Sequence, residues 1–376
     1  MSEAFVAADG VLKQVFGPAA WALPFGSIVQ GVHLDGSDLD LCFDEAPQED
    51  GSTSAVDEGG RVDNTRQVAA LKQVLGGLQG RFRVIETRFW KHMKVPIVIL
   101  GYRTSVGIEI ETDISVGTVF EGVEKGFTDR VIRRVLAQNP HILHMARLVK
   151  LWAKVEKLNK AYDGYLNSLG WTLLVLYFCL ERGHFDPSLL LEEEPNERGP
   201  GGDASALPPP LLAAPERGEE AHEEQLQHVP LVEDMADFFE WMASWETWWP
   251  QEPPPIDVDS SASPSLGGAW GLSLVDGTIM EVPKPSKVWP DTCSFFIEDP
   301  GVRLAKGTSE NVARSLKTGT WATTIERCGA AAAALREESE DPGTAWISEL
   351  LRGVAAEKAA KAAPMRQPRF ATPAAA

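Results

Sequence analysis

Cysteine is scarce in this sequence, and the few cysteines form no recognisable site. The 376 residues contain four: Cys42, Cys179, Cys293 and Cys328. They are widely separated and include no Cys-x-x-Cys pair, which argues against a disulfide framework or a cysteine-based zinc site and favours reduced thiols in an intracellular protein. His141 and His144 are spaced to meet on one helix face, but no cysteine or carboxylate lies near them in the sequence. We therefore do not interpret this pair as metal ligands.

Long apolar runs are absent as well. The longest, Trp171 to Leu180, falls far short of the roughly 20 residues that a membrane-spanning helix needs. The start, Met1-Ser2-Glu3, has neither the basic residues nor the sustained apolar stretch of a secretion signal. We therefore expect a protein without a membrane partner, in the cytoplasm, the nucleus or an organelle.

Basic residues are few, 35 against 54 acidic ones, for a net charge of −19. This balance argues against a protein that coats nucleic acid by bulk charge, but it permits an enzyme that holds a few terminal nucleotides. The basic residues concentrate in 125–160, opposed there only by Asp129 and Glu156: Lys125, Arg130, Arg133, Arg134, Arg147, Lys150, Lys154, Lys157 and Lys160. We expect phosphate groups to bind at this basic island, although a solvated helical face would have the same composition.

The most informative segment is a Gly-Ser pair, Gly26-Ser27, followed by two aspartates, Asp38 and Asp40. Alternation over 38–43 predicts a strand with both carboxylates on one face, about 7 Å apart, and apolar side chains on the other. Paired carboxylates can share hard cations such as Mg²⁺, and a Gly-Ser turn offers N–H groups and a hydroxyl to phosphate. However, an isolated Asp-x-Asp motif is often only a solvated strand end.

A second acidic strand follows at 107–116, GIEIETDISV. Its isoleucines face one way, while Glu109, Glu111 and Asp113 face the other. Unpaired carboxylates on a buried face would cost folding free energy, and a bound metal ion would offset that cost. The alternative interpretation is that this face of the sheet is exposed to solvent. Asp113 is the preferred third acid, and Glu111 replaces it if the register differs.

These segments resemble a known family. The GS-x10-DxD pattern, VPIVIL (95–100) and ETDIS (111–115) resemble the DNA polymerase β-like nucleotidyltransferases. Three further blocks occur in the family's order and resemble its branch of non-canonical poly(A) polymerases and terminal uridylyltransferases: ARLVKLWAK (146–154), GYLNSLGWTLLVLYFCL (164–180) and SFFIEDP…SENVARSL (294–316).

The resemblance implies an α+β fold in which a mixed-sheet catalytic domain packs on a mainly helical poly(A)-polymerase-associated domain, with a cleft between them. The first helix is expected to pack on the helical domain, and residues 250–290 are expected to be irregular. The expected boundaries are 21–125 for the catalytic domain, 1–20 and 126–335 for the helical domain, 186–228 for a disordered insertion, and 336–376 for an Ala-rich tail with one helix at 342–363.

The resemblance also implies a site. Asp38, Asp40 and Asp113 would be the catalytic acids and would hold two Mg²⁺ (or Mn²⁺) ions. By the same resemblance, eight further residues are expected to bind the nucleotide: Gly26, Ser27, Lys150, Lys154, Ser168, Asp299, Glu310 and Asn311.

The sequence departs from the family where the base is read. Leu169 replaces the tyrosine that often follows the family serine, and Gly117-Thr118 replaces an asparagine pair. Glu310 stands where UTP-preferring relatives commonly have histidine. An ionised glutamate accepts a hydrogen bond from the adenine amino group but has no proton for O4 of uracil, which favours ATP over UTP.

The predicted function is template-independent addition of AMP or UMP, from ATP or UTP, to an RNA 3′-hydroxyl, with release of pyrophosphate. A member acting on a small hydroxyl compound is one alternative, and a catalytically weak or inactive scaffold that binds RNA or a protein is another. The sequence shows no RNA-recognition module, so we expect a protein partner to select the RNA.

Overall fold

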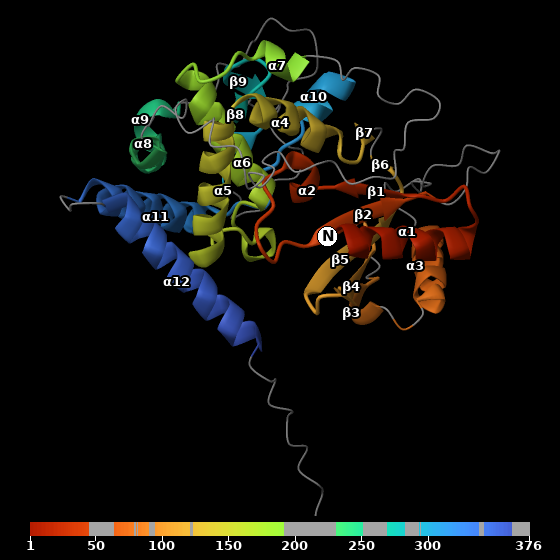
Figure 1. Ribbon diagram of the computed structural model, residues 1–376. Coiled ribbons are helices and arrows are strands. Elements are labelled where there is room, and N and C mark those ends of the chain that lie inside the picture. The colour runs from red at the N-terminus through yellow and green to blue at the C-terminus, as the bar shows by residue number, and fades with distance from the viewer. Residues whose placement is uncertain are drawn as a thin grey trace, which may run out of the picture.

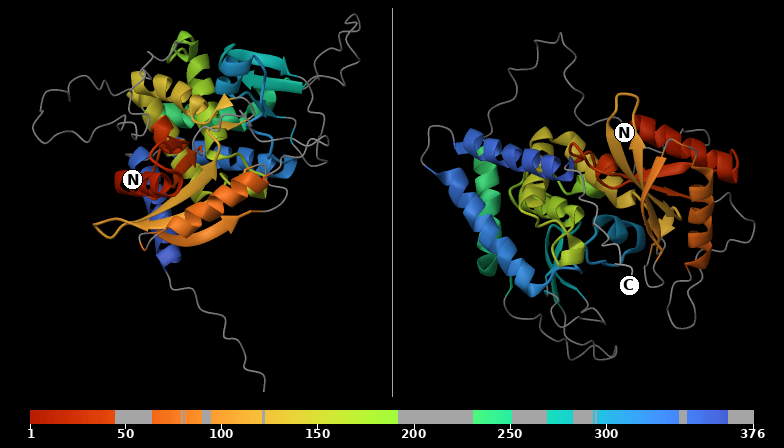
Figure 2. Two further views of the ribbon diagram at one scale, coloured as in Figure 1. Left: turned by 90° about the vertical axis from the view of Figure 1, so that its right-hand side faces the viewer. Right: turned by 90° about the horizontal axis from the view of Figure 1, so that it is seen from below.

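The computed structural model describes residues 1–44, 64–78, 80, 82–89, 95–120, 123–191, 231–250, 269–282, 293, 295–337 and 342–362. A five-stranded sheet with two helices occupies one side of the molecule, and a larger group of helices occupies the other (Figure 1). Two further directions of view show the same division (Figure 2). The predicted α+β fold is confirmed.

The large sheet is mixed. Its strand order is β1 (Ala22–Phe25), β2 (Leu39–Phe43), β5 (Glu109–Val116), β4 (Ile97–Arg103) and β3 (Phe82–Arg88). The β2–β5 pair is parallel and the other pairs are antiparallel. In β2, Leu39, Leu41 and Phe43 are fully buried, as the alternation predicts. Asp40 of the same strand therefore lies on the opposite face of the sheet.

Helices α1 (Ser2–Phe16) and α3 (Thr65–Gly77) cover the apolar face of this sheet. Phe5 and Leu12 of α1 share one hydrophobic core with Leu41 of β2 and Leu71 of α3. The expectation that the first helix packs on the helical domain was wrong. An amphipathic pattern predicts that a helix buries one face, but it does not say against which partner.

The helical part contains most of the remaining elements. They are α4 (Phe127–Gln138), α5 (Pro140–Val155), α6 (Ser168–Glu181), α7 (Ser188–Leu191), α8 (Leu231–Ala243), α9 (Trp245–Trp248), α10 (Pro300–Lys306) and α11 (Thr318–Arg336). Helix α6 is central, because residues 170–179 are all buried. Asn139 separates α4 from α5 and caps α5 by accepting hydrogen bonds from two backbone N–H groups.

Two short sheets complete the fold. Strands β6 (Val119–Phe120) and β7 (Val123–Glu124) form a hairpin, whereas β8 (Ala269–Ser273), β9 (Thr278–Val282) and β10 (Phe296–Ile297) form a three-stranded sheet. The expectation of irregular chain over 250–290 was therefore wrong for β8 and β9. Their connection contains Gly277 at φ 64°, which suits a tight turn.

The C-terminal helix α12 (Pro342–Ala362) confirms the helix expected at 342–363. It is more than a tail, because Leu350 is buried in the helical core and the Trp346 ring lies 6.1 Å from that of Phe239. Within the expected insertion, α7 is ordered, whereas 192–228 lies outside the described residues. None of the described helices has the length and apolar character needed to cross a membrane.

Candidate active site

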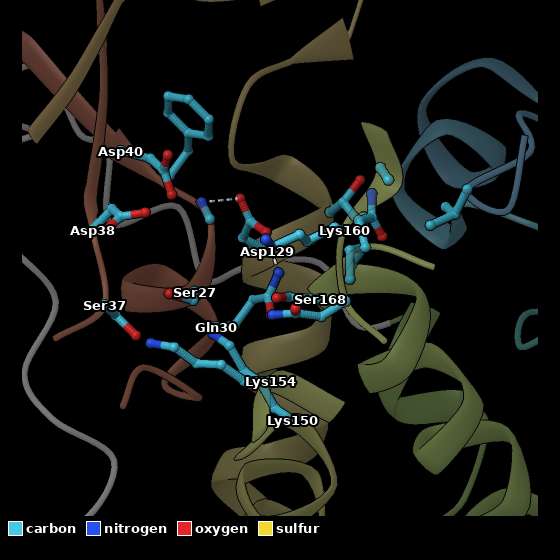
Figure 3. Close-up of a pocket in the computed structure, with 18 of the residues that line it drawn as sticks. Ser27, Gln30, Ser37, Asp38, Asp40, Asp129, Lys150, Lys154, Lys160 and Ser168 are labelled. Carbon is cyan, nitrogen blue, oxygen red and sulfur yellow. Dashed lines mark hydrogen bonds between the residues drawn. The ribbon is translucent and has the colours of Figure 1, made fainter. Parts of the chain in front are cut away.

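The three predicted catalytic acids meet on adjacent strands. Asp40 of β2 lies in register with Asp113 of β5, and Asp38 directly precedes β2. Neighbouring strands are about 4.8 Å apart, so the two carboxylates share one small region of the polar face of the sheet. Figure 3 shows Asp38 and Asp40 side by side at the cavity.

Burial and mutual repulsion disfavour negative charge on these acids. Burial first, and then Asp113 and Asp38, raise the pKa of Asp40 to about 8. Burial, Asp38 and Glu111 raise the pKa of Asp113 to about 7. The buried Oδ1 atom of Asp113 accepts no hydrogen bond from any described residue. A crowded set of carboxylate oxygens with an unsatisfied acceptor fits a hard divalent cation such as Mg²⁺ or Mn²⁺.

These pKa values predict how stability depends on pH. Asp40 and Asp113 titrate far above the roughly 3.9 of an unfolded aspartate, so the folded chain binds protons more tightly than the unfolded chain. The metal-free protein should lose stability as the pH rises from about 4 to about 8 and then level off. Melting temperatures in EDTA at about pH 6 and about pH 8 test this. Asp40→Asn should remove much of that difference, and an unchanged slope in this variant would contradict the assignment.

Two lysines of α5 extend toward the part of the cavity lined by Ser27 and Ser37 (Figure 3). Lys150 is 7 % exposed, and its Nζ donates to the Val32 carbonyl at 3.3 Å. Burial lowers its pKa to about 8, against the opposing effect of Asp40. Lys154 lines the same cavity one turn further along α5. Both ammonium groups are placed to bind phosphate oxygens as point charges.

The Gly-Ser turn is held in place by a carboxylate of the helical part. Ser27 begins α2 (Ser27–Gln30), and Gly26 precedes it at φ 72°. Asp129 of α4 accepts one hydrogen bond from the Gly26 N–H and another from Nε2 of Gln30, both at 2.6 Å (Figure 3). This carboxylate therefore fixes the turn from across the boundary between the two parts of the molecule.

Replacing Asp129 with asparagine should disturb this turn. Both partners of the Asp129 carboxylate are donors, so an asparagine always turns its own NH₂ group toward one of them and loses a hydrogen bond. Leaving one buried group unpaired costs about 1–3 kcal/mol. We expect activity to fall by about tenfold and the melting temperature to decrease. Gln30→Ala, which leaves the Gly26 contact in place, should have the smaller effect on activity; the reverse order would contradict this role.

The basic island divides into two groups. Arg130 pairs with Glu124, and the other three arginines bind backbone carbonyls: Arg133 that of Val29, Arg134 that of Leu190 and Arg147 that of Gly31. Its lysines line the cavity: Lys125, Lys150, Lys154, Lys157 and Lys160. The lysines therefore remain the predicted phosphate-binding residues, while these three arginines hold the backbone.

The cavity has a volume of about 1340 Å³ and lies between the two parts of the molecule. Its size exceeds the roughly 300–1,000 Å³ typical of a site for one small ligand. Most predicted site residues line it: Gly26, Ser27, Asp38, Asp40, Lys150, Lys154, Ser168, Asp299 and Glu310. Asp113 lies behind Asp40 on the neighbouring strand, and Glu111 is the member of β5 that lines the cavity.

The side predicted to read the base has mixed roles. Asp299 lines the cavity, caps α10 and accepts a hydrogen bond from the Thr128 hydroxyl at 2.6 Å. Glu310 lines it and forms an ion pair with Arg314. The structure does not bring Asn311 into the lining, because its side-chain oxygen accepts from the N–H groups of Ile297 and Ala313.

The sequence analysis did not predict three residues that contact the candidate site: Asp129, Gln30 and Arg314. Asp129 was noticed only as an acid within the basic island, and that isolation was the one available signal. Gln30 and Arg314 carried no signal, since each acts through a contact that only the fold creates.

Thr118, which stands where the resemblance leads us to expect an asparagine, donates its backbone N–H to Asp44 at 3.1 Å.

Comparison with known proteins agrees with this geometry. No family model matches the chain. Terminal uridylyltransferase cid1 of Schizosaccharomyces pombe is 27 % identical over 196 residues, and terminal uridylyltransferase 4 of Trypanosoma brucei brucei is 30 % identical over 169. The matches cover 50 % and 43 % of this chain and 42 % and 46 % of those proteins, so the chain spans less than half of the relatives' length.

Solved structures share the fold along nearly the whole chain. The Cid1 poly(U) polymerase with MgGTP has a TM-score of 0.58 and 20 % identity, over 93 % of this chain and 91 % of that one. The mtPAP structure with GTP has a TM-score of 0.58 and 15 % identity, over 94 % and 69 %. The chain is thus similar in sequence to terminal uridylyltransferases and shares the fold of solved terminal uridylyltransferase and poly(A) polymerase structures. The resemblance noted in the sequence is confirmed. The matching Asp38, Asp40, Gly-Ser turn and lysines line one cavity here, and Asp113 lies in register with Asp40.

Proposed function

We propose that the chain is a template-independent RNA nucleotidyltransferase that adds AMP or UMP to an RNA 3′-hydroxyl and releases pyrophosphate. The observation that carries the proposal is that Asp38 and Asp40 line one cavity together with Lys150 and Lys154, while Asp113 lies in register with Asp40. The volume of this cavity can accommodate a nucleoside triphosphate together with the last nucleotide of an RNA. The names of the relatives and structural neighbours support the same reaction class.

The residues divide the chemistry between them. Asp38, Asp40 and Asp113 would hold Mg²⁺, which supplies charge neutralisation at the phosphates and a more acidic 3′-hydroxyl. Lys150 and Lys154 bind the β- and γ-phosphate oxygens and so favour the departing pyrophosphate. The turn at Gly26-Ser27 binds the triphosphate through N–H and hydroxyl groups. Asp113 would also accept the proton of the 3′-hydroxyl.

Primer extension tests the proposal. The purified chain is incubated with Mg²⁺, a labelled single-stranded RNA and each nucleoside triphosphate separately, beside Asp38→Ala. Growth of the primer with ATP or UTP, absent in the variant, is the expected result. Failure to extend with any nucleotide, in Mg²⁺ or Mn²⁺, while RNA or nucleotide still binds would reject the proposal in favour of a binding scaffold.

We further propose that ATP is preferred over UTP and that Glu310 contributes to this choice. Glu310→Gln keeps an acceptor for the adenine amino group and adds an N–H donor for O4 of uracil. The ratio of ATP to UTP incorporation, measured as kcat/KM, should fall by about tenfold, which corresponds to one base-specific hydrogen bond of about 1.4 kcal/mol.

Arg314→Gln provides the matched control for this change. It breaks the same ion pair but leaves the Glu310 carboxylate in the cavity. The base preference should therefore remain close to that of the unaltered chain. An equal shift in both variants would show that the ion pair, and not Glu310 itself, affects the base.

The choice of RNA is proposed to come from a protein partner in the cytoplasm or nucleus. In this proposal the cavity holds only the end of an RNA, so recognition of a longer sequence would need a surface beyond it.

A further inference from the structure

A second cluster of metal-ligating side chains lies outside the active site. His141 is near the start of α5, His184 follows the end of α6, and Asp234 is in the first turn of α8. One ligand atom from each of the three lies within 4.8 Å of the corresponding atoms of the other two. Residues 43 to 93 positions apart in the chain thus converge on one point.

We propose that His141, His184 and Asp234 bind a divalent transition-metal ion, with Zn²⁺ as the expected occupant, which joins α5, the end of α6 and α8. The Nε2 atom of His141 lies 2.6 Å from Oδ2 of Asp234, in a hydrogen bond that the ion would replace, because two ligand atoms on one tetrahedral Zn²⁺ lie about 3.4 Å apart. The rings of His141 and His184 are nearly parallel, at 8°, with their centroids 5.9 Å apart. A small separation of His141 from Asp234, together with a movement of the His184 side chain, would bring all three donors to one ion.

The surroundings hold the two histidines in place. Asn139 accepts a hydrogen bond from the His141 N–H at 3.0 Å and donates its own NH₂ to the His184 carbonyl at 3.1 Å. The His184 N–H is in turn bonded to the Cys179 carbonyl at the end of α6. One side chain therefore fixes the backbone at both histidines.

The donor set distinguishes this site from the catalytic acids. Two imidazoles and one carboxylate suit Zn²⁺ and similar ions, whereas an all-oxygen set suits Mg²⁺. Three protein ligands leave a fourth position for water. His141 and Asp234 are 18 % and 14 % exposed, so an ion can reach them from solvent. The chain would thus separate two metals by donor chemistry.

The consequence of binding is a cross-link between distant segments. Residues 192–230 separate α7 from α8, and α8 carries Phe238 and Phe239 into the helical core. An ion bound only by the folded chain stabilises the docked position of α8 by mass action. The role is structural and leaves the chemistry to the acids of β2 and β5.

Competition with a chromogenic Zn²⁺ chelator tests the proposal on the full chain, with millimolar Mg²⁺ present to occupy the catalytic acids. We expect one Zn²⁺ per chain, bound at least about tenfold more weakly by His184→Ala. His184→Ala is the informative variant because it leaves the His141–Asp234 contact in place. His144→Ala is the matched control, since His144 lies one turn along α5 from His141 but outside the cluster.

A second readout separates binding from folding. Zn²⁺ should raise the melting temperature of the unaltered chain and of His144→Ala, and raise that of His184→Ala clearly less. Equal Zn²⁺ affinity in His184→Ala, no Zn²⁺ uptake by the unaltered chain, or loss of uptake in Asp38→Ala would overturn the proposal. In those cases His141 and Asp234 form a plain hydrogen-bonded pair. Primer extension plays no part in this test, so its outcome is independent of the proposed function.

Discussion

Asp113→Asn is expected to reduce primer extension by about three orders of magnitude, whereas Glu111→Gln should reduce it by less than about tenfold. Both residues are on the acidic side of β5, but only Asp113 lies in register with Asp40. Its Oδ1 is buried and accepts no hydrogen bond from the described residues, whereas Glu111 is exposed. Single-turnover extension at saturating Mg²⁺ and nucleotide provides the measurement.

A measurement of stability distinguishes loss of chemistry from loss of fold. Burial and neighbouring carboxylates disfavour the charge on Asp113, so a neutral asparagine relieves repulsion in the metal-free protein. The melting temperature of Asp113→Asn in EDTA at about pH 8 should therefore equal or exceed that of the unaltered chain. If Glu111→Gln shows the larger loss of extension, Glu111 and not Asp113 is the third acid.

The same repulsion explains why the acids are arranged to bind a cation. Besides burial, Asp113 and Asp38 raise the pKa of Asp40, and Asp38 also raises the pKa of Asp113. Lys150 offsets only part of the shift at Asp40. A divalent ion bound there would remove this repulsion and favour the charged form of each carboxylate. Its binding would then recover the free energy that the empty cluster costs the fold.

The sequence predicted the components of this site because they depend on local patterns. Alternation in β2 and β5 assigned each acid to the polar face, and a helical pattern assigned the lysines to one side of α5. The meeting of Asp40 and Asp113 required the parallel pairing of two strands far apart in the chain. The family resemblance supplied that pairing, because periodicity alone does not give a register.

The features that sequence reasoning missed depend on long-range contacts. Asp129 holds Gly26 across 103 residues, and no local pattern marks a carboxylate that acts on a distant N–H group. His141 was considered beside His144, three residues away, but its partners in the fold are His184 and Asp234. Short-range spacing offered no carboxylate partner for His141, because the end of α6 and the start of α8 meet α5 only through packing.

Gly26→Ala is expected to reduce extension by at least about 100-fold, since two separate effects act at this position. Gly26 has φ 72° and ψ −151°, a region that is essentially restricted to glycine. A Cβ atom there would also lie 2.5 Å from Oδ2 of Asp40. The catalytic carboxylate would have to move, and a displacement of about 1 Å in a reacting group costs about 10²-fold in rate.

Gly17→Ala separates these two effects. Gly17 follows α1 at φ 95° and ψ 170°, in the same part of conformational space, but a Cβ atom there meets nothing within 4 Å. Both variants should lose a similar amount of stability to backbone strain, about 1–3 kcal/mol, measured by denaturant unfolding. Extension by Gly17→Ala should remain within about twofold of the unaltered chain under conditions where it is folded. If the two variants lose activity equally, strain is the cause, and the close approach of Gly26 to Asp40 has no role in placing the carboxylate.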